Sequence, residues 1–106
     1  MTIESAQEAW DVVFGMCLIN SSPTLVLFDF GASHSFIAHR FVKEHNIPKC
    51  PMKKQMLVDS PCGDMQATLT CPSVRVEIRG VEFLANLIVL KSSSIDVILG
   101  MDWLNQ

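Results

Sequence analysis

An isolated acidic residue at the end of an apolar run is the part of this sequence best suited to chemistry. The run extends from Leu25 to Phe28, the acid is Asp29, and the chain then turns through Gly31 and Ala32. A carboxylate among apolar neighbours is costly to bury as an isolated charge. Two interpretations of Asp29 are therefore open. It caps the N-terminus of a following helix, or it meets the same residue of a second chain across a two-fold axis.

Pairing across a two-fold axis would give this carboxylate a catalytic function. Two close carboxylates cannot both ionise easily, so they share a proton. One of them can then act as a general base for a bound water, and the other as a general acid for a substrate carbonyl. Such a pair hydrolyses a peptide bond without a metal or a covalent intermediate. Gly31 would let the backbone turn close to the acid, and Ala32 would keep its surroundings small.

The first half of the chain predicts two strands and one helix around this acid. Val12 to Ile19 is β-branched, aromatic or apolar, which is typical of a buried strand. A polar turn separates it from a second strand over Thr24 to Phe28, and the short connection predicts an antiparallel pair. Beyond the acid, apolar residues at helical spacing predict a helix that begins at Ser33 or Ser35 as the N-cap and ends near Asn46.

In the second half of the chain, the sequence pattern is typical of short strands separated by turns. A turn-rich cluster covers residues 59–64, and a further turn is expected at Gly80. The predicted strands are Met52 to Val58, Met65 to Thr70, Val74 to Ile78, Val81 to Leu90 and Ile95 to Leu99, with at most one helical turn over Met101 to Asn105. This pattern indicates a mostly β single domain, a small closed β-barrel-like structure with one or two short helices. We expect a lead-in segment over residues 1–11 and the folded domain over residues 12–106.

Two blocks of the sequence resemble those of retropepsins, the aspartic proteases of retroviruses and Ty3/gypsy-type retrotransposons. The first block runs from Asp29 to Ile37, and the second runs from Asp96 to Leu104, about 70 residues further along the chain. The Gly-Met-Asp-Trp-Leu ending is similar to the versions in plant Ty3/gypsy elements. Because both blocks occur in the right order with a glycine hairpin between them, the resemblance is more specific than either block alone. It extends from about Val12 to Leu104.

The resemblance implies a retropepsin-like fold and an aspartic endopeptidase that acts as a homodimer, with Asp29 as the one catalytic acid of each chain. Its substrate would be a Gag-Pol-type polyprotein, and no cofactor or metal is implied. The active-site loop would comprise Phe30, Gly31, Ala32 and Ser33. The flap that closes over the substrate would comprise Ser60, Pro61, Cys62, Gly63 and Asp64. The segment that supports the loop from beneath would comprise Ile98, Leu99 and Gly100.

Phe30 departs from the family pattern, in which Thr or Ser follows the catalytic acid. In the family, that hydroxyl forms a hydrogen bond across the dimer, and phenylalanine has neither donor nor acceptor. We therefore expect a weakened or rearranged dimer with low or no activity. The alternative is a catalytically impaired or inactive retropepsin fold that serves as a dimerisation or interaction module. A domain of the ubiquitin-shuttle type shares this fold and dimer, but the chain contains no ubiquitin-like segment.

Composition, charge and length exclude some other classes of function. The 106 residues suit one domain. Hydrophobic residues make up 49% and charged residues only 18%, against about 25% charged in typical soluble domains. The apolar excess indicates a partner, a substrate groove or simply a strand-rich core. The net charge of −3 argues against a nucleic-acid-binding surface. Asp-Phe-Gly also matches the kinase magnesium motif, but the chain is far too short and lacks the other kinase motifs.

Cysteine and histidine spacing predicts no metal site. The four cysteines form no C-x-x-C pair, and Cys17 lies in an apolar run as a small hydrophobic residue. His34, His39 and His45 are not four residues apart, and we expect them at solvated helix positions. No stretch is apolar enough to span a membrane, and no secretory signal is evident. These features predict reduced thiols and a cytoplasmic location, and the resemblance to retrotransposon proteases adds the interior of virus-like particles.

Overall fold

The computed structural model describes residues 12–60, 63–91 and 94–104. Within these ranges the chain forms seven strands and two short helices, which confirms the mostly β prediction. The elements are β1 (Val12–Ile19), β2 (Ser22–Asp29), β3 (Phe36–Ala38), α2 (His39–Glu44), β4 (Cys50–Ser60), β5 (Gly63–Ile78), β6 (Val81–Leu90), β7 (Val97–Leu99) and α3 (Met101–Leu104). The expected lead-in segment over residues 1–11 lies outside the described residues.

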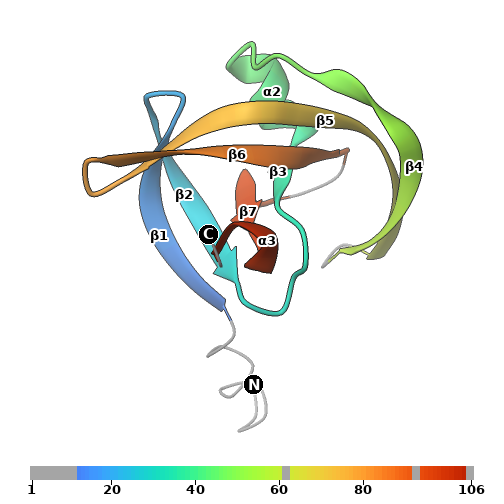
Figure 1. The fold of residues 1–106 in the computed structure, drawn as a ribbon, viewed down its shortest axis with the longest axis horizontal. Coiled ribbons are helices and arrows are strands. Elements are labelled where there is room, and N and C mark those ends of the chain that lie inside the picture. Colours follow the sequence, from blue (N-terminus) through green and yellow to red (C-terminus); the bar gives the residue numbers. More distant parts are fainter. Residues whose placement is uncertain (1–11, 61–62, 92–93, 105–106) are drawn as a thin grey trace, which may run out of the picture.

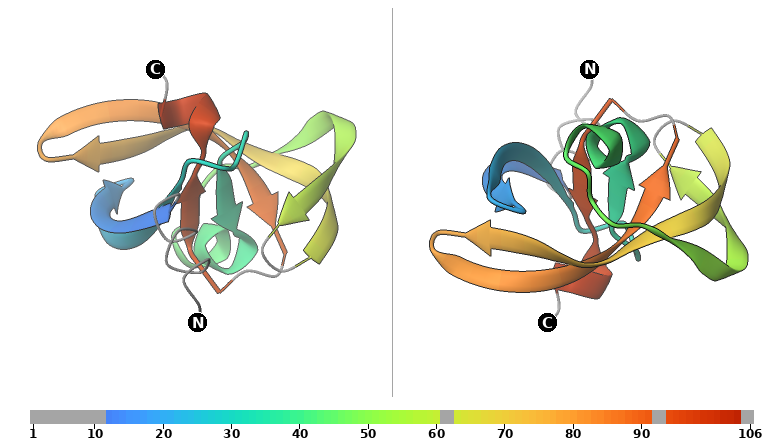
Figure 2. Two further views of the ribbon diagram at one scale, coloured as in Figure 1. Left: turned by 90° about the horizontal axis from the view of Figure 1, so that it is seen from below. Right: turned by 90° about the horizontal axis from the view of Figure 1, so that it is seen from above.

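The sheet closes into a six-stranded barrel. Its strands follow the order β1-β2-β7-β3-β6-β5, and β5 returns to β1 where Leu18 pairs with Glu77. β4 extends the sheet beyond β5 as one arm of a long curved hairpin (Figure 1). This hairpin projects from one side of the barrel and the β5–β6 turn from the other, while α2 and α3 lie on opposite sides (Figure 2). The closed-barrel prediction is confirmed.

The central strands are buried on both faces. Successive side chains of a strand point to opposite faces, and in β2 Val26 belongs to the interior cluster while Leu27 belongs to an outer cluster. The outer cluster is covered by the β4–β5 hairpin, which contributes Ala67, with Met52 and Met56 packed against it. Two-sided burial explains why these strands are continuous apolar runs rather than alternating ones. It also places the hairpin directly over the strands that carry the loop after Asp29.

The predicted helix from Ser33 or Ser35 to Asn46 is wrong at its beginning. The structure has strand β3 over Phe36–Ala38, and α2 covers only His39–Glu44. All three β3 residues are buried, and they pair with β6 on one side and β7 on the other. A helix would bury only one face of this segment, so pairing between two strands satisfies more of its apolar surface and backbone. The helix N-cap is Ala38, without a side-chain cap.

Two predicted strands, Met65 to Thr70 and Val74 to Ile78, are one continuous strand. β5 passes through both, with an irregularity between Cys71 and Val74 in its pairing with β6. Ser73 adopts a φ of 55° there, and its backbone N–H donates to Asn86 Oδ1 at 2.9 Å. The residues between the two predicted strands therefore form a bulge inside a long strand.

The buried cysteines and the tryptophan belong to the interior core. Cys17 and Cys71 are buried, and burial raises the pKa of both thiols, although Lys49 partly opposes this at Cys71. Trp103 is buried in the same cluster and meets Phe83 edge to face, with ring centroids 5.3 Å apart. The interpretation of Cys17 as a small hydrophobic residue of the core is confirmed.

Candidate active site

Asp29 is the last residue of β2, where an apolar strand delivers its half-buried carboxylate to an exposed turn. Gly31 N–H donates to Asp29 Oδ1 at 2.9 Å, and Ala32 N–H donates to the Asp29 carbonyl at 3.2 Å. The first contact is an Asx-type turn, in which an acidic side chain accepts a backbone N–H two residues on. The carboxylate is thus held by its own loop and does not cap a helix.

The segment that the resemblance implied as the support of this loop lies in β7, which contains Ile98 and Leu99, and at Gly100 directly after it. β7 lies between β2, which leads into the loop, and β3, which follows it, so that Ile98 pairs with both Leu27 and Phe36. Ile98, Leu99 and Gly100 are all buried. The two ends of the loop are therefore fixed to one short strand.

Gly100 lies so close to the loop that no other residue fits without movement. A Cβ atom at this position would overlap the His34 carbonyl oxygen and lie 2.7 Å from that of Ala32. The next residue, Met101, donates its backbone N–H to the Ala32 carbonyl at 2.6 Å. Close backbone approach, rather than an unusual φ, accounts for glycine here.

The buried hydroxyl of Ser35 also holds the end of the loop against the segment that follows β7. Ser35 is only 1% exposed, and its Oγ donates to Asp102 Oδ1 at 2.7 Å and accepts from Gly100 N–H at 2.9 Å. Ser35 therefore connects the end of the loop to both β7 and α3, instead of capping a helix as one sequence interpretation held. A buried donor and acceptor that are both satisfied fix a single loop geometry.

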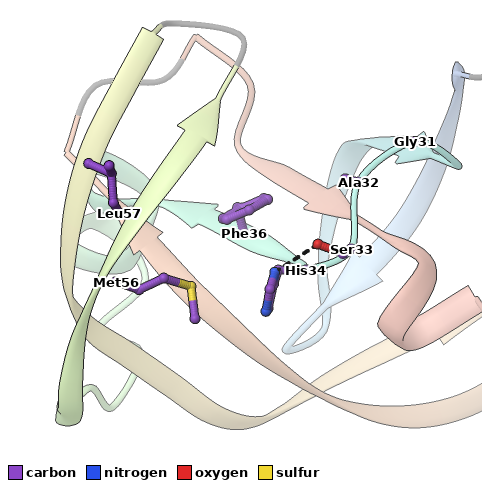
Figure 3. A pocket seen from close by; sticks show the side chains of 7 residues that line it. All are labelled: Gly31, Ala32, Ser33, His34, Phe36, Met56 and Leu57. Atoms are coloured by element: carbon purple, nitrogen blue, oxygen red, sulfur yellow. Dashed lines mark hydrogen bonds between the residues drawn. The ribbon is translucent and has the colours of Figure 1, made fainter.

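A pocket of about 410 Å³ opens beside the loop. Gly31 to His34 and Phe36 form one wall, and Met56 and Leu57 of β4 form the other (Figure 3). Ala32, Phe36 and Met56 also belong to or pack against the outer apolar cluster. The pocket is therefore a space between the loop that carries the acid and the hairpin that covers the barrel.

The expected flap residues are placed only in part. Ser60 and Gly63 pair at the end of the β4–β5 hairpin, next to the pair formed by Asp59 and Asp64. Pro61 and Cys62 lie outside the described residues. The hairpin itself, predicted from the turn-rich cluster, is confirmed.

The loop residues after Asp29 are largely exposed to solvent. Phe30 is 47% exposed, Gly31 and Ser33 are exposed, and Ala32 is half-buried. Exposure of Phe30 directly beside the acid is unusual, because burial of a phenylalanine side chain is favourable. The ring presents an apolar surface beside Asp29.

Sequence reasoning missed four residues around the site. His34 lies in the loop and lines the pocket, whereas we expected it on a helix. Phe36 and Met56 were predicted only as apolar positions of secondary structure, although strand alternation in Met52 to Val58 could have assigned Met56 to an inner face. The Ser35 contact with Asp102 joins residues 67 positions apart, which no local pattern indicates.

The described ranges contain no cluster of three or more His, Cys, Asp or Glu side chains that could hold a metal. Within the same ranges, no helix has the length and apolar character needed to cross a membrane.

Comparisons with known proteins agree with this geometry. The EIAV protease in complex with the inhibitor HBY-793 has a similar fold, with a TM-score of 0.70 and 22% identity over 89% of this chain and 86% of that one. The retroviral protease-like domain of Ddi1 from Leishmania major has a TM-score of 0.67 and 18% identity over 89% of this chain and 75% of that one. No curated protein sequence matches. The profile of the retroviral aspartyl protease family matches residues 1–106, and the chain belongs to this family.

Proposed function

We propose that this protein is an aspartic endopeptidase that acts as a homodimer, with one Asp29 from each chain. Its task would be to process the Gag-Pol-type polyprotein of a Ty3/gypsy-type retrotransposon, in the cytoplasm or within virus-like particles. Family membership and the blocks around Asp29 and Gly100 support this proposal. The observation that carries it is the Asp29 carboxylate, which accepts a hydrogen bond from Gly31 N–H in a loop whose next residues line a pocket between loop and hairpin.

The chemistry requires two carboxylates that share one proton. One Asp29 removes a proton from a bound water as it attacks the peptide carbonyl, while the other gives its proton to the carbonyl oxygen. The resulting diol collapses, the C–N bond breaks, and a proton passes to the leaving amine. No atom of the protein becomes covalently attached to the substrate. The β4–β5 hairpin would act as the flap that excludes water during these steps.

Phe30 favours a second candidate, an inactive member of the fold that serves as a dimerisation or interaction module. The residue supplies no hydroxyl to hold two loops in register, yet its half-exposed ring presents an apolar surface beside Asp29. In this case the dimer would form through apolar contact and the carboxylates would not be aligned for catalysis.

One experiment separates the two candidates. An unfolded protein substrate is incubated with wild type and with Asp29→Asn across about pH 4 to 7, at concentrations where sedimentation detects a dimer. The endopeptidase proposal expects proteolysis in wild type that disappears in the variant and is blocked by a statine-type inhibitor. Equal background cleavage by both dimeric proteins would reject the endopeptidase and favour the interaction module.

A further inference from the structure

The pocket beside Asp29 has a mixed apolar and polar lining, and one of its described side chains can carry charge. Phe36 from β3 and Met56 from β4 face the space from two sides, and Figure 3 shows Met56 and His34 extending into the gap between the hairpin and the loop. Among the described residues that line the pocket, His34 alone has an ionisable side chain. Any charge that this part of the lining presents to a ligand therefore comes from one imidazole.

The position of the imidazole is fixed by its neighbour. His34 Nδ1 lies 3.1 Å from Ser33 Oγ, at hydrogen-bonding distance. Within the described part of the chain, no hydrogen bond involves Nε2, which leaves this nitrogen for a ligand. A serine hydroxyl can either donate or accept. When Ser33 donates to Nδ1, the neutral ring carries its proton on Nε2, and the protonated ring carries one there as well. His34 can thus present an N–H to an acceptor in both charge states.

We propose that this is a specificity pocket for a glutamate side chain of an extended peptide, and that His34 is the specificity-determining residue. The inference rests on the proposed function in that the ligand is a peptide chain. The two methylene groups of glutamate would lie against Phe36 and Met56, and its carboxylate would accept a hydrogen bond from Nε2. No carboxylate is found among the described residues that line the pocket, and the exposed Lys53 and Lys54 on β4 add positive charge to the same strand.

The test measures binding rather than cleavage, so that it does not depend on catalysis. Labelled peptides of alanine and valine carry one glutamate that is moved along the sequence, with matched glutamine and leucine sets. Fluorescence anisotropy gives their affinities for the full chain carrying Asp29→Asn. We expect one position at which the glutamate peptide binds about tenfold tighter than its glutamine counterpart, corresponding to roughly 1.4 kcal/mol.

Substitutions at His34 then test whether its side chain is the group that binds the glutamate carboxylate. The residue is exposed, so its variants should fold, which circular dichroism checks. His34→Leu should abolish the preference and His34→Lys should keep it. His34→Glu should transfer it to an additional peptide that carries lysine in place of the glutamate. The control is His39→Gln on α2, a histidine that does not line the pocket and should leave the preference unchanged.

Equal binding of glutamate, glutamine and leucine peptides at every position would overturn the inference, and so would a glutamate preference that survives His34→Leu. Absence of binding by every peptide would overturn it as well. The endopeptidase proposal is judged separately, by incubating the best glutamate peptide with wild type. If that peptide binds with the expected preference but stays intact, the specificity pocket stands and the endopeptidase fails.

Discussion

Replacing Gly100 by alanine tests whether the loop that carries Asp29 is held by close backbone packing. The new methyl group would overlap the His34 carbonyl oxygen and lie 2.7 Å from the Ala32 carbonyl oxygen. Both are backbone atoms, so neither can move aside as the end of a flexible side chain could. The loop and α3 must separate.

The cost can be worked from the contacts at stake. Separation stretches or breaks two hydrogen bonds, from Gly100 N–H to Ser35 Oγ at 2.9 Å and from Met101 N–H to the Ala32 carbonyl at 2.6 Å. Each contributes about 1 kcal/mol, and overpacking a fitted site costs about 1–3 kcal/mol. The free energy of unfolding should therefore fall by about 3–5 kcal/mol, a large part of the 5–15 kcal/mol that is typical of a domain.

Urea denaturation of wild type and Gly100→Ala at equal protein concentration measures this loss. With a slope of about 1–3 kcal/mol per molar urea, the midpoint should fall by roughly 1–3 M or more. Gly31→Ala is the matched control from the same loop, because its Cβ would lie 3.4 Å from Asp29 Oδ1, close to ordinary contact. A loss below about 1 kcal/mol for Gly100→Ala, or one equal to that of the control, would refute the packing argument.

Three further predictions concern the loop and the core. Phe30→Ser should restore a hydroxyl beside the acid and raise dimer affinity or peptidase rate by about tenfold, measured by sedimentation and peptide cleavage. Ser35→Ala should cost about 1–3 kcal/mol in urea denaturation, because it leaves the buried N–H of Gly100 without an acceptor. Burial raises the thiol pKa of Cys17 and Cys71, so each binds more protons in the folded than in the unfolded chain at alkaline pH. The free energy of unfolding should therefore fall as pH rises above about 8.5, as urea denaturation at stepped pH can detect.

Each of these three predictions has an outcome that would contradict it, and two of them have a control variant within the chain. No change in either dimer affinity or rate for Phe30→Ser would contradict the expected role of the missing hydroxyl. Ser33→Ala removes an exposed hydroxyl from the same loop and should cost less than about 0.5 kcal/mol; equal losses for Ser33→Ala and Ser35→Ala would argue against the buried network. Cys50 is exposed, so Cys50→Ser should keep the alkaline slope, whereas loss of the slope in this variant would count against the buried thiols.

The strands were predictable because their signals are local. The apolar residues from Val12 to Ile19 and the alternation of Val74 to Ile78 each specify a strand without reference to the rest of the chain. The prediction failed at Phe36–Ala38, where the apolar spacing suits a helix and a strand equally. Only the presence of β6 and β7 on either side of this segment decides between them. Its pairing partners lie about 50 to 60 residues away in the sequence.

The candidate site also has features that the local sequence predicts and features that depend on tertiary contacts. The sequence by itself determined the acid, its tight turn and the later glycine segment, because each is a short run of residue types with a direct chemical meaning. The tertiary structure decided what surrounds Asp29: the support of the loop by Gly100, the buried contact of Ser35 with Asp102, and the exposure of His34 to a pocket bounded by β4. These contacts join segments that are distant in sequence. They exist only because long-range strand pairing places β7 between β2 and β3 beneath one hairpin, and local propensity carries no information about that pairing.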